Sequence, residues 1–312
     1  MTKLKHIELN LWLWCNHKCI FCMSWAARWR VLLLEKYEVL KWEIEELSLK
    51  WYNSIWFLWW EPTIHTRFLD LIILAKGKWF KNIEVISNWS KFCDNKFLKQ
   101  SVSNWLTRIS ISIHSINREE EAVLTGGIKN VLNEKVDAIK NIIRYNKEGF
   151  LKQEISVNIV VSKVNYKNIK KLILVLYKLW VRSFRLNFIQ LEWYSVDNYD
   201  ILALKYEDFK NYLISIISLH KKYTDIRINF EAIPWCYSWL NYEDFLKYSE
   251  QDIDREKDKI SRDDIDLVSR DIMNQLDRRK ELKVYLKKCD NCFLKWTCEW
   301  IWKRYVDYFK IK

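Results

Sequence analysis

The chain has 312 residues, a formal net charge of +12 and an apolar fraction of 50%, which suits one large domain with an appendage. It contains no apolar run of about 18 residues or more, so a membrane-spanning helix is not expected. Lysines are spread along nearly every segment rather than gathered in one stripe. We therefore interpret the charge mainly as a solvated surface, and a nucleic-acid partner is possible but not favoured.

The N-terminus lacks the apolar region and the cleavage site of a signal peptide. The eight cysteines of the chain consequently indicate a reducing compartment, and we expect a cytoplasmic protein with no membrane partner.

Strand-like and helix-like patterns alternate from residue 7 to about residue 230. Short apolar runs predict strands at 7–13, 54–58, 83–87, 108–114, 154–162 and 183–189. Helical periods lie at 33–49, 66–77, 95–103, 130–147 and 166–178, followed by a further helix at about 207–221 and a strand at 225–230. Repeated strand–helix units predict an α/β fold with a parallel sheet or barrel. Six units are too few to close an eight-stranded barrel.

Three cysteines follow the first predicted strand within eight residues, at Cys15, Cys19 and Cys22. Such a cluster in an intracellular chain indicates metal or redox chemistry rather than disulfides. A structural zinc site needs four ligands, and His17, the available fourth, lies between two of the thiols. An iron–sulfur cluster accepts three thiolates and keeps one iron open. The spacing favours iron–sulfur, and zinc stays open.

The C-x3-C-x2-C spacing, with Phe21 before the last cysteine, resembles the signature of the radical S-adenosylmethionine (SAM) superfamily. A second landmark of that family is a Gly-Gly-Glu-Pro turn after the second strand. Glu61 and Pro62 match it, whereas Trp59 and Trp60 stand in place of both glycines. The resemblance implies a partial (β/α)6 TIM-type barrel over residues 1–230, open on one side to admit a large substrate.

The resemblance also implies the cofactors. Cys15, Cys19 and Cys22 would hold a [4Fe-4S] cluster whose open iron binds the amino and carboxylate groups of SAM. The reduced cluster would cleave SAM to a 5′-deoxyadenosyl radical, with electrons from a reductant such as flavodoxin or ferredoxin. The residues that would contact SAM are Phe21, Trp59, Trp60, Glu61, Pro62, Ser87, Asn88, Ser112 and Asn158. His65, His114 and His220 have no evident base or nucleophile to pair with, so we expect them to be structural.

A second cysteine group lies near the C-terminus, after a charged connector at 241–288. Cys289, Cys292 and Cys298 follow a C-x2-C-x5-C spacing, and Cys236 would supply a fourth ligand. Residues 231–312 resemble the auxiliary-cluster extensions, of twitch or SPASM type, of radical SAM enzymes. They imply a second [4Fe-4S] cluster, with structural zinc as the alternative. Only Cys93 is then unassigned.

Many radical SAM enzymes with such extensions modify peptides, so the resemblance favours radical modification of a peptide or protein side chain. The basic charge leaves RNA or nucleotide modification as an alternative. A third interpretation, from another class, is a non-catalytic zinc-stabilised RNA-binding module.

The balance of tryptophan and glycine is unusual, with 19 Trp and 4 Gly. An average chain of this length would have about 22 Gly. Trp51, Trp79, Trp105 and Trp180 each follow a helical pattern and precede a strand, where a left-handed glycine is common. We hypothesise that most of these tryptophans are glycines in the organism, with UGA read as glycine. Trp302 is expected to be authentic, and a truly tryptophan-rich protein is the alternative.

Overall fold

The computed structural model describes residues 5–12, 14–22, 36–128, 130–191, 193–248, 258–260, 273–274, 282–295, 298 and 301–311. Within them, no helix is both long and apolar enough to cross a membrane.

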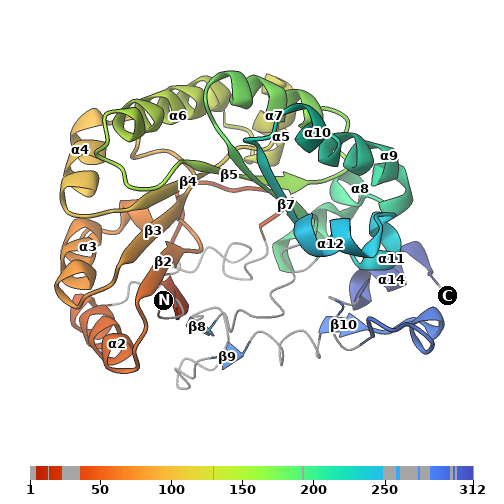
Figure 1. Cartoon of the computed structure of the whole chain (residues 1–312), viewed down its shortest axis with the longest axis horizontal. Coiled ribbons are helices and arrows are strands. Elements are labelled where there is room, and N and C mark those ends of the chain that lie inside the picture. The colour runs from red at the N-terminus through yellow and green to blue at the C-terminus, as the bar shows by residue number, and fades with distance from the viewer. Residues whose placement is uncertain are drawn as a thin grey trace.

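Seven parallel strands curl into a half-barrel with helices along its outer side (Figure 1). Their spatial order, β7-β6-β5-β4-β3-β2-β1, follows the chain without interruption. A short parallel strand, β8 (Asp258–Ile260), extends the sheet beyond β1, and β9 (Met273–Asn274) pairs with it in antiparallel fashion. The partial TIM-type barrel is confirmed, and the strand predicted at 225–230 forms the seventh strand of its arc. The strands are β1 (His6–Asn10), β2 (Ser54–Leu58), β3 (Asn82–Ser87), β4 (Arg108–Ser112), β5 (Ser156–Val161), β6 (Ser183–Phe188) and β7 (Arg227–Glu231).

The covering helices lie within a few residues of the predicted ranges. They are α2 (Tyr37–Leu49), α3 (Phe68–Gly77), α4 (Asn95–Ser103), α6 (Val131–Lys147), α7 (Ile169–Lys178) and α9 (Tyr206–Ile217). The helix predicted at 207–221 is divided into α9 and α10 (Leu219–Lys222). Several further short helices were not predicted, among them α5 (Arg118–Leu124), η2 (Trp193–Asn198) and α8 (Tyr199–Leu202).

The two faces of the sheet differ in chemistry. Leu9, Phe57 and Val85 are register neighbours on β1, β2 and β3, and all are fully buried in the core cluster that includes the helices. Successive side chains of a strand point to opposite faces, so the intervening residues face the hollow of the arc. Polar residues at such positions are Glu8, Glu84, Arg108, Ser112, Asn158, Arg185, Asn187, Asn229 and Glu231. The hollow therefore has a polar lining, unlike the apolar interior of a closed barrel.

The C-terminal segment returns to the β7 side of the half-barrel (Figure 1). It contains α11 (Trp235–Ser238), α12 (Tyr242–Tyr248), β10 (Lys283–Val284), η3 (Lys287–Cys289), β11 (Ile301–Trp302) and α14 (Lys303–Phe309). The Tyr305 hydroxyl of α14 accepts a hydrogen bond of 2.8 Å from the Tyr206 backbone N–H, and their rings are 4.4 Å apart. This contact fixes α14 to the start of α9. The connector predicted at 241–288 lies largely outside the described residues.

Candidate active site

The loop that carries the first three cysteines leaves β1 and is held by the turns after β2 and β3. The Glu61 N–H donates to the Trp14 carbonyl at 3.2 Å. The Asn88 side-chain amide donates to Asn16 Oδ1 at 2.7 Å. Because β1, β2 and β3 are parallel neighbours, their carboxyl ends meet at one edge of the sheet, and these bonds join the loop to that edge.

The other side of the loop rests on the end of α5. The Ile20 N–H donates to the Leu124 carbonyl at 3.1 Å, and the Asn198 side chain donates to the Ile20 carbonyl at 3.2 Å. Gly126 has φ +83°, and a Cβ on it would collide with the Lys18 carbonyl. Glycine is therefore required where α5 approaches the cysteine loop.

The three thiols of this loop influence one another's titration. Burial raises the pKa of Cys15 well above its usual value, and the charges of Cys19 and Glu61 raise it further. Burial raises the pKa of Cys19 to about 12. The Cys15 sulfur accepts hydrogen bonds from the His17 N–H at 3.4 Å and from Asn88 Nδ2 at 3.7 Å. Such donors favour a thiolate over a thiol.

The donor set fits an iron–sulfur cluster in its chemistry. Three neighbouring cysteines, one already hydrogen-bonded at sulfur, are the ligands that such a cluster takes. Among the described residues no three His, Cys, Asp or Glu side chains are arranged to hold a metal ion. Since cluster ligands are thiolates, the three cysteines would have to lose their protons to bind a cluster.

Glu61 is fully buried between the turns after β2 and β3. Its carboxylate accepts hydrogen bonds from the Thr63 N–H at 3.2 Å and from the Thr63 hydroxyl. It also accepts from the Ser87 hydroxyl at 2.9 Å and from the Asn88 N–H at 2.5 Å. Burial raises the pKa of Glu61, and these donors oppose the rise. The carboxylate thus joins the two turns. Two of its donors, the N–H and the hydroxyl of Thr63, belong to the helix η1 (Pro62–Ile64), which begins at Pro62.

Two of the other predicted SAM contacts lie in the turn just before Glu61. Trp59 and Trp60 precede it with φ of 68° and 55°, both in the left-handed region. The Trp12 indole N–H donates to the Glu61 carbonyl at 3.1 Å, which joins this turn to the segment that follows β1. Phe21 packs edge-on against His114, with ring centroids 4.6 Å apart.

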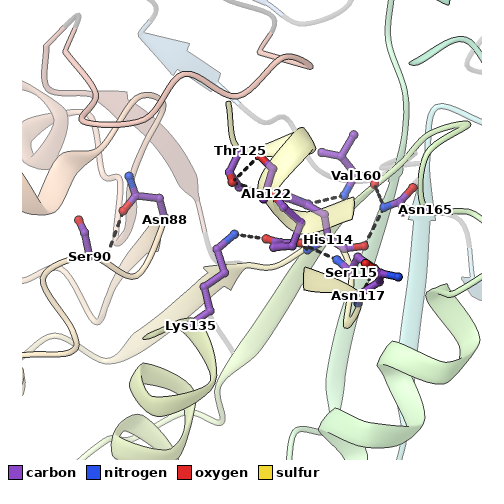
Figure 2. A network of polar contacts seen from close by, with 11 residues as sticks. Asn88, Ser90, His114, Ser115, Asn117, Ala122, Thr125, Lys135, Val160 and Asn165 are labelled. Carbon is purple, nitrogen blue, oxygen red and sulfur yellow. Dashed lines mark hydrogen bonds and ion pairs between the residues drawn. The ribbon is translucent and has the colours of Figure 1, made fainter. Parts of the chain in front are cut away.

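The turn after β4 is held by a buried ion pair. Glu121 of α5 accepts hydrogen bonds from the backbone N–H groups of His114 and Ser115, at 2.9 and 2.6 Å. Its other oxygen binds Lys135 of α6, and both side chains are at most 1% exposed. Figure 2 shows Lys135 extending from α6 toward this turn. Burial alone would raise the pKa of Glu121, but the Lys135 charge and the hydrogen bonds donated by Lys135 and by the His114 N–H hold it below its usual value.

These bonds explain why β4 ends at Ser112, two residues before the predicted end. The His114 Nδ1 accepts from the Val160 N–H at 3.1 Å, and Asn165 Nδ2 donates to the His114 carbonyl at 2.7 Å (Figure 2). Burial lowers the pKa of His114 to about 3, so the ring is neutral near pH 7. His114 therefore has the structural role that the sequence predicted.

Ser112 and Asn158 are register partners on β4 and β5 and face the hollow of the arc. The structure thus assembles Cys15, Cys19, Glu61, Ser87 and Asn88 around one edge, with Ser112 and Asn158 farther along the sheet. Sequence reasoning missed several residues that hold this edge: Asn16, Glu121, Gly126, Lys135 and Asn198. Gly126 carried a signal, because Gly126-Gly127 contains two of the four glycines in the chain.

The second cysteine group also comes together in part. Burial raises the pKa of Cys236; the Lys288 ammonium lowers it, and the charges of Cys298 and Cys289 raise it. Cys236 on α11 therefore lies near two cysteines that are more than 50 residues away in the chain. The Cys292 N–H donates to the Cys289 carbonyl at 3.1 Å, which forms a tight turn. Cys93 is separate from both groups, and its thiol donates to the Glu134 carbonyl at 3.3 Å.

The family model described as "Radical SAM superfamily" matches residues 9–176, more than half of the chain. The chain belongs to the radical SAM superfamily. It is therefore an enzyme of a family whose members use SAM and a [4Fe-4S] cluster. Membership removes the support for a non-catalytic zinc-stabilised RNA-binding module.

A tungsten-containing aldehyde ferredoxin oxidoreductase cofactor-modifying protein of Pyrococcus furiosus is 25% identical over 181 residues. That match covers 54% of this chain and 47% of the relative, so the chain spans about half the length of the curated relative that it matches.

Solved structures share the fold of this radical SAM chain. Streptococcus suis SuiB bound to S-adenosylmethionine has a TM-score of 0.66 at 16% identity, with 99% of this chain and 75% of SuiB covered. Native anSMEcpe with bound AdoMet has a TM-score of 0.56 at 15% identity, covering 73% of this chain and 63% of that one. Methylornithine synthase (PylB) has a TM-score of 0.55 at 13% identity, covering 89% of this chain and 80% of that one.

Proposed function

We propose that this radical SAM enzyme modifies a peptide or protein side chain in the hollow of its half-barrel. The observation that carries the proposal is the cysteine loop, held at the carboxyl edge of a sheet whose inner face is polar. An open arc with a polar lining suits an extended, polar chain better than a small apolar molecule.

In this proposal Cys15, Cys19 and Cys22 hold the [4Fe-4S] cluster. When bound, the cluster and SAM supply a one-electron cleavage that starts radical chemistry, with a flavodoxin or ferredoxin as reductant. The His17 N–H and the Asn88 amide donate to the Cys15 sulfur and stabilise negative charge there. The buried Lys135 ammonium lies close enough to Cys19 to lower its pKa, against the larger effect of burial.

The proposed SAM site is the edge formed by the turns after β2 and β3, together with the inner face of β4 and β5. Ser87 donates to Glu61, so its hydroxyl positions that carboxylate. Glu61 in turn fixes the backbone of residues 59–63, which would face the amino group of SAM. The remaining proposed contacts are Phe21, Trp59, Trp60, Pro62, Asn88, Ser112 and Asn158.

Two further observations support a peptide as substrate. One SuiB structure is described as bound to the precursor peptide SuiA, and it matches this chain with a TM-score of 0.65. One anSMEcpe structure contains a Kp18Cys peptide, with a TM-score of 0.55. In this chain the inner face of β6 and β7 carries amide and charged groups that can bind a peptide backbone: Arg185, Asn187, Asn229 and Glu231.

We also propose that residues 231–312 form an auxiliary extension with a second [4Fe-4S] cluster. Cys236, Cys289, Cys292 and Cys298 would be its ligands. The electrostatic effects of Cys289 and Cys298 on the pKa of Cys236 support this grouping. A cluster there would join the end of the barrel core, at residue 230, to the C-terminal tail.

The substrate class is tested with the anaerobically reconstituted full chain, SAM, a reductant and peptides encoded beside its gene. We expect 5′-deoxyadenosine formation to rise with peptide, and the peptide mass to change by a fixed amount. Product formation with an RNA oligonucleotide and none with any peptide would contradict the peptide assignment while leaving the family chemistry intact.

A further inference from the structure

Eight of the described tryptophans have a backbone conformation that side-chain-bearing residues rarely adopt. Their φ angles lie between 55° and 89°. Eleven described non-glycine residues have positive φ, and eight of these are tryptophan. A bulky residue in this region is a conformational outlier, whereas glycine enters it freely. The eight are Trp51, Trp59, Trp60, Trp79, Trp89, Trp105, Trp180 and Trp239.

Four of them end helices in one hydrogen-bonding pattern. After α2, the Trp51 N–H donates to the Ser48 carbonyl at 3.0 Å, and the Tyr52 N–H donates to the Leu47 carbonyl at 3.1 Å. This pair of bonds defines a Schellman motif, in which the first donor is the left-handed residue, usually glycine. The same two bonds recur at Trp79 after α3, Trp105 after α4 and Trp180 after α7.

The chain contains its own comparison for these helix ends. Gly149, with φ 78°, follows α6, and its N–H donates to Asn146 while the Phe150 N–H donates to Tyr145. Gly126, with φ 83°, follows α5; its N–H donates to the Val123 carbonyl, and the Gly127 N–H donates to the Ala122 carbonyl. Six helices of the half-barrel thus end in one motif, and the same position is glycine in two and tryptophan in four.

Burial does not explain the exposed members of this set. Trp51 and Trp79 are each 84% exposed, and Trp180 is 60% exposed. An indole in water gains almost none of the hydrophobic stabilisation that could compensate for a strained backbone.

The remaining members include the turns at the active-site edge. Trp59 and Trp60 are consecutive left-handed residues, as are Gly126 and Gly127. Trp89 follows Asn88 with φ 89° and is 2% exposed. Two successive left-handed residues with side chains are disfavoured, and Gly-Gly is the usual solution.

We propose that the native protein has glycine at these eight positions. One codon, UGA, read as glycine in the native organism and as tryptophan in the printed translation, accounts for the whole set. The inference does not rest on the proposed function, because it comes from backbone geometry alone. It is limited to these eight, since Trp12, Trp14, Trp42, Trp56, Trp193, Trp235 and Trp302 have no left-handed backbone.

For the active site, the inference means that the turn before Glu61 and the turn after Asn88 are lined by backbone rather than by indoles. The three positions flank the carboxylate that accepts from Ser87 and Asn88. Ligand groups could then approach the backbone N–H and carbonyl groups of the turn directly.

Tandem mass spectrometry of the protein isolated from its native cells tests the proposal. Peptides of the printed sequence, made in a host that inserts tryptophan at UGA, provide the reference masses. We expect glycine at all eight positions, each with the mass loss of one indole side chain, and a UGA codon at each position in the gene. Tryptophan in the native peptides at any of the eight, or a UGG codon there, would overturn the proposal for the set.

Discussion

At the scale of single residues, the buried Glu121–Lys135 pair controls the geometry beside the cysteine loop. Glu121 binds two backbone N–H groups after β4, and α5 carries the carbonyl that receives the Ile20 N–H. A buried pair contributes little relative to apolar residues, but one partner left alone in the interior is strongly destabilising.

Lys135→Met should therefore lower the free energy of unfolding by about 3–5 kcal/mol, measured by urea denaturation. The double variant Glu121→Gln with Lys135→Met should recover part of this loss, because no buried charge remains. Lys140→Met removes an exposed pair with Asp137 and should change stability by less than about 1 kcal/mol. Equal effects of the two lysine variants would contradict the role of the buried pair.

His114 predicts a specific dependence of stability on pH. Its pKa is about 3 in the folded protein, because of burial, and about 6.5 in an unfolded chain. Between these values the unfolded chain binds more protons, so His114 makes stability fall as pH falls from about 6.5 to 3, by up to about 1.4 kcal/mol per pH unit.

His114→Asn should flatten that part of the profile, since an amide oxygen can accept from the Val160 N–H without titrating. Denaturation midpoints measured at intervals from pH 8 to pH 4 give the comparison. Parallel profiles for the two proteins would mean that the pKa of His114 is the same in the folded and the unfolded chain, which would contradict the effect of burial.

At the scale of helices and strands, the sequence predicted the regular elements well because their apolar patterns are long and periodic. The strand at Ser54–Leu58 and the helix at Asn95–Ser103 lie where they were predicted. The helix α5 was missed because it has seven residues and three consecutive glutamates. Its signal was local: the Asn117 side chain accepts from the Glu119 and Glu120 N–H groups, as an N-cap does.

The active-site edge was predictable only where a motif marked it. The cysteine spacing and the Glu61-Pro62 pair identified the loop and its facing turn. The Glu121–Lys135 pair was not predictable, because its members lie on two helices and belong to no local pattern. The sequence placed Glu61, Ser87 and Asn88 at one site but did not predict the hydrogen bonds between them. Ser87 and Asn88 lie 26 and 27 residues from Glu61, so no local pattern indicates these bonds.

Helix ends give a direct energetic test of the left-handed tryptophans. Trp51→Gly should raise the free energy of unfolding by about 1–2 kcal/mol, because it removes the Cβ strain and loses almost no burial. Trp51→Ala is the matched control: it also removes the indole but keeps a Cβ, so it should gain much less. A gain from alanine as large as that from glycine would show that the indole, and not the backbone, carries the cost.

At the scale of the whole molecule, one contact joins the C-terminal segment to the half-barrel and another brings distant parts of that segment together. Tyr305 of α14 binds the start of α9, and Cys236 of α11 lies near the C-terminal cysteines. A cluster at the second contact would cross-link segments that are distant in sequence, and its binding energy would contribute to the folding of the tail.

Cys236→Ala should therefore reduce the iron and sulfide bound per chain and make the tail more sensitive to proteolysis, while the barrel keeps its thermal transition. Cys93→Ala, which alters a cysteine outside both groups, should keep the full iron content. A Cys236→Ala protein with undiminished iron would mean that the C-terminal site has three cysteine ligands.

The central claim is that the loop after β1 holds the cluster that cleaves SAM. The most direct measurement is 5′-deoxyadenosine formation by the anaerobically reconstituted, reduced protein, carried out with glycine at positions 59 and 60. Cys19→Ala should abolish this product and leave iron at the C-terminal site, whereas Cys93→Ala should form it at the unaltered rate. Undiminished 5′-deoxyadenosine from the Cys19→Ala protein would contradict the account.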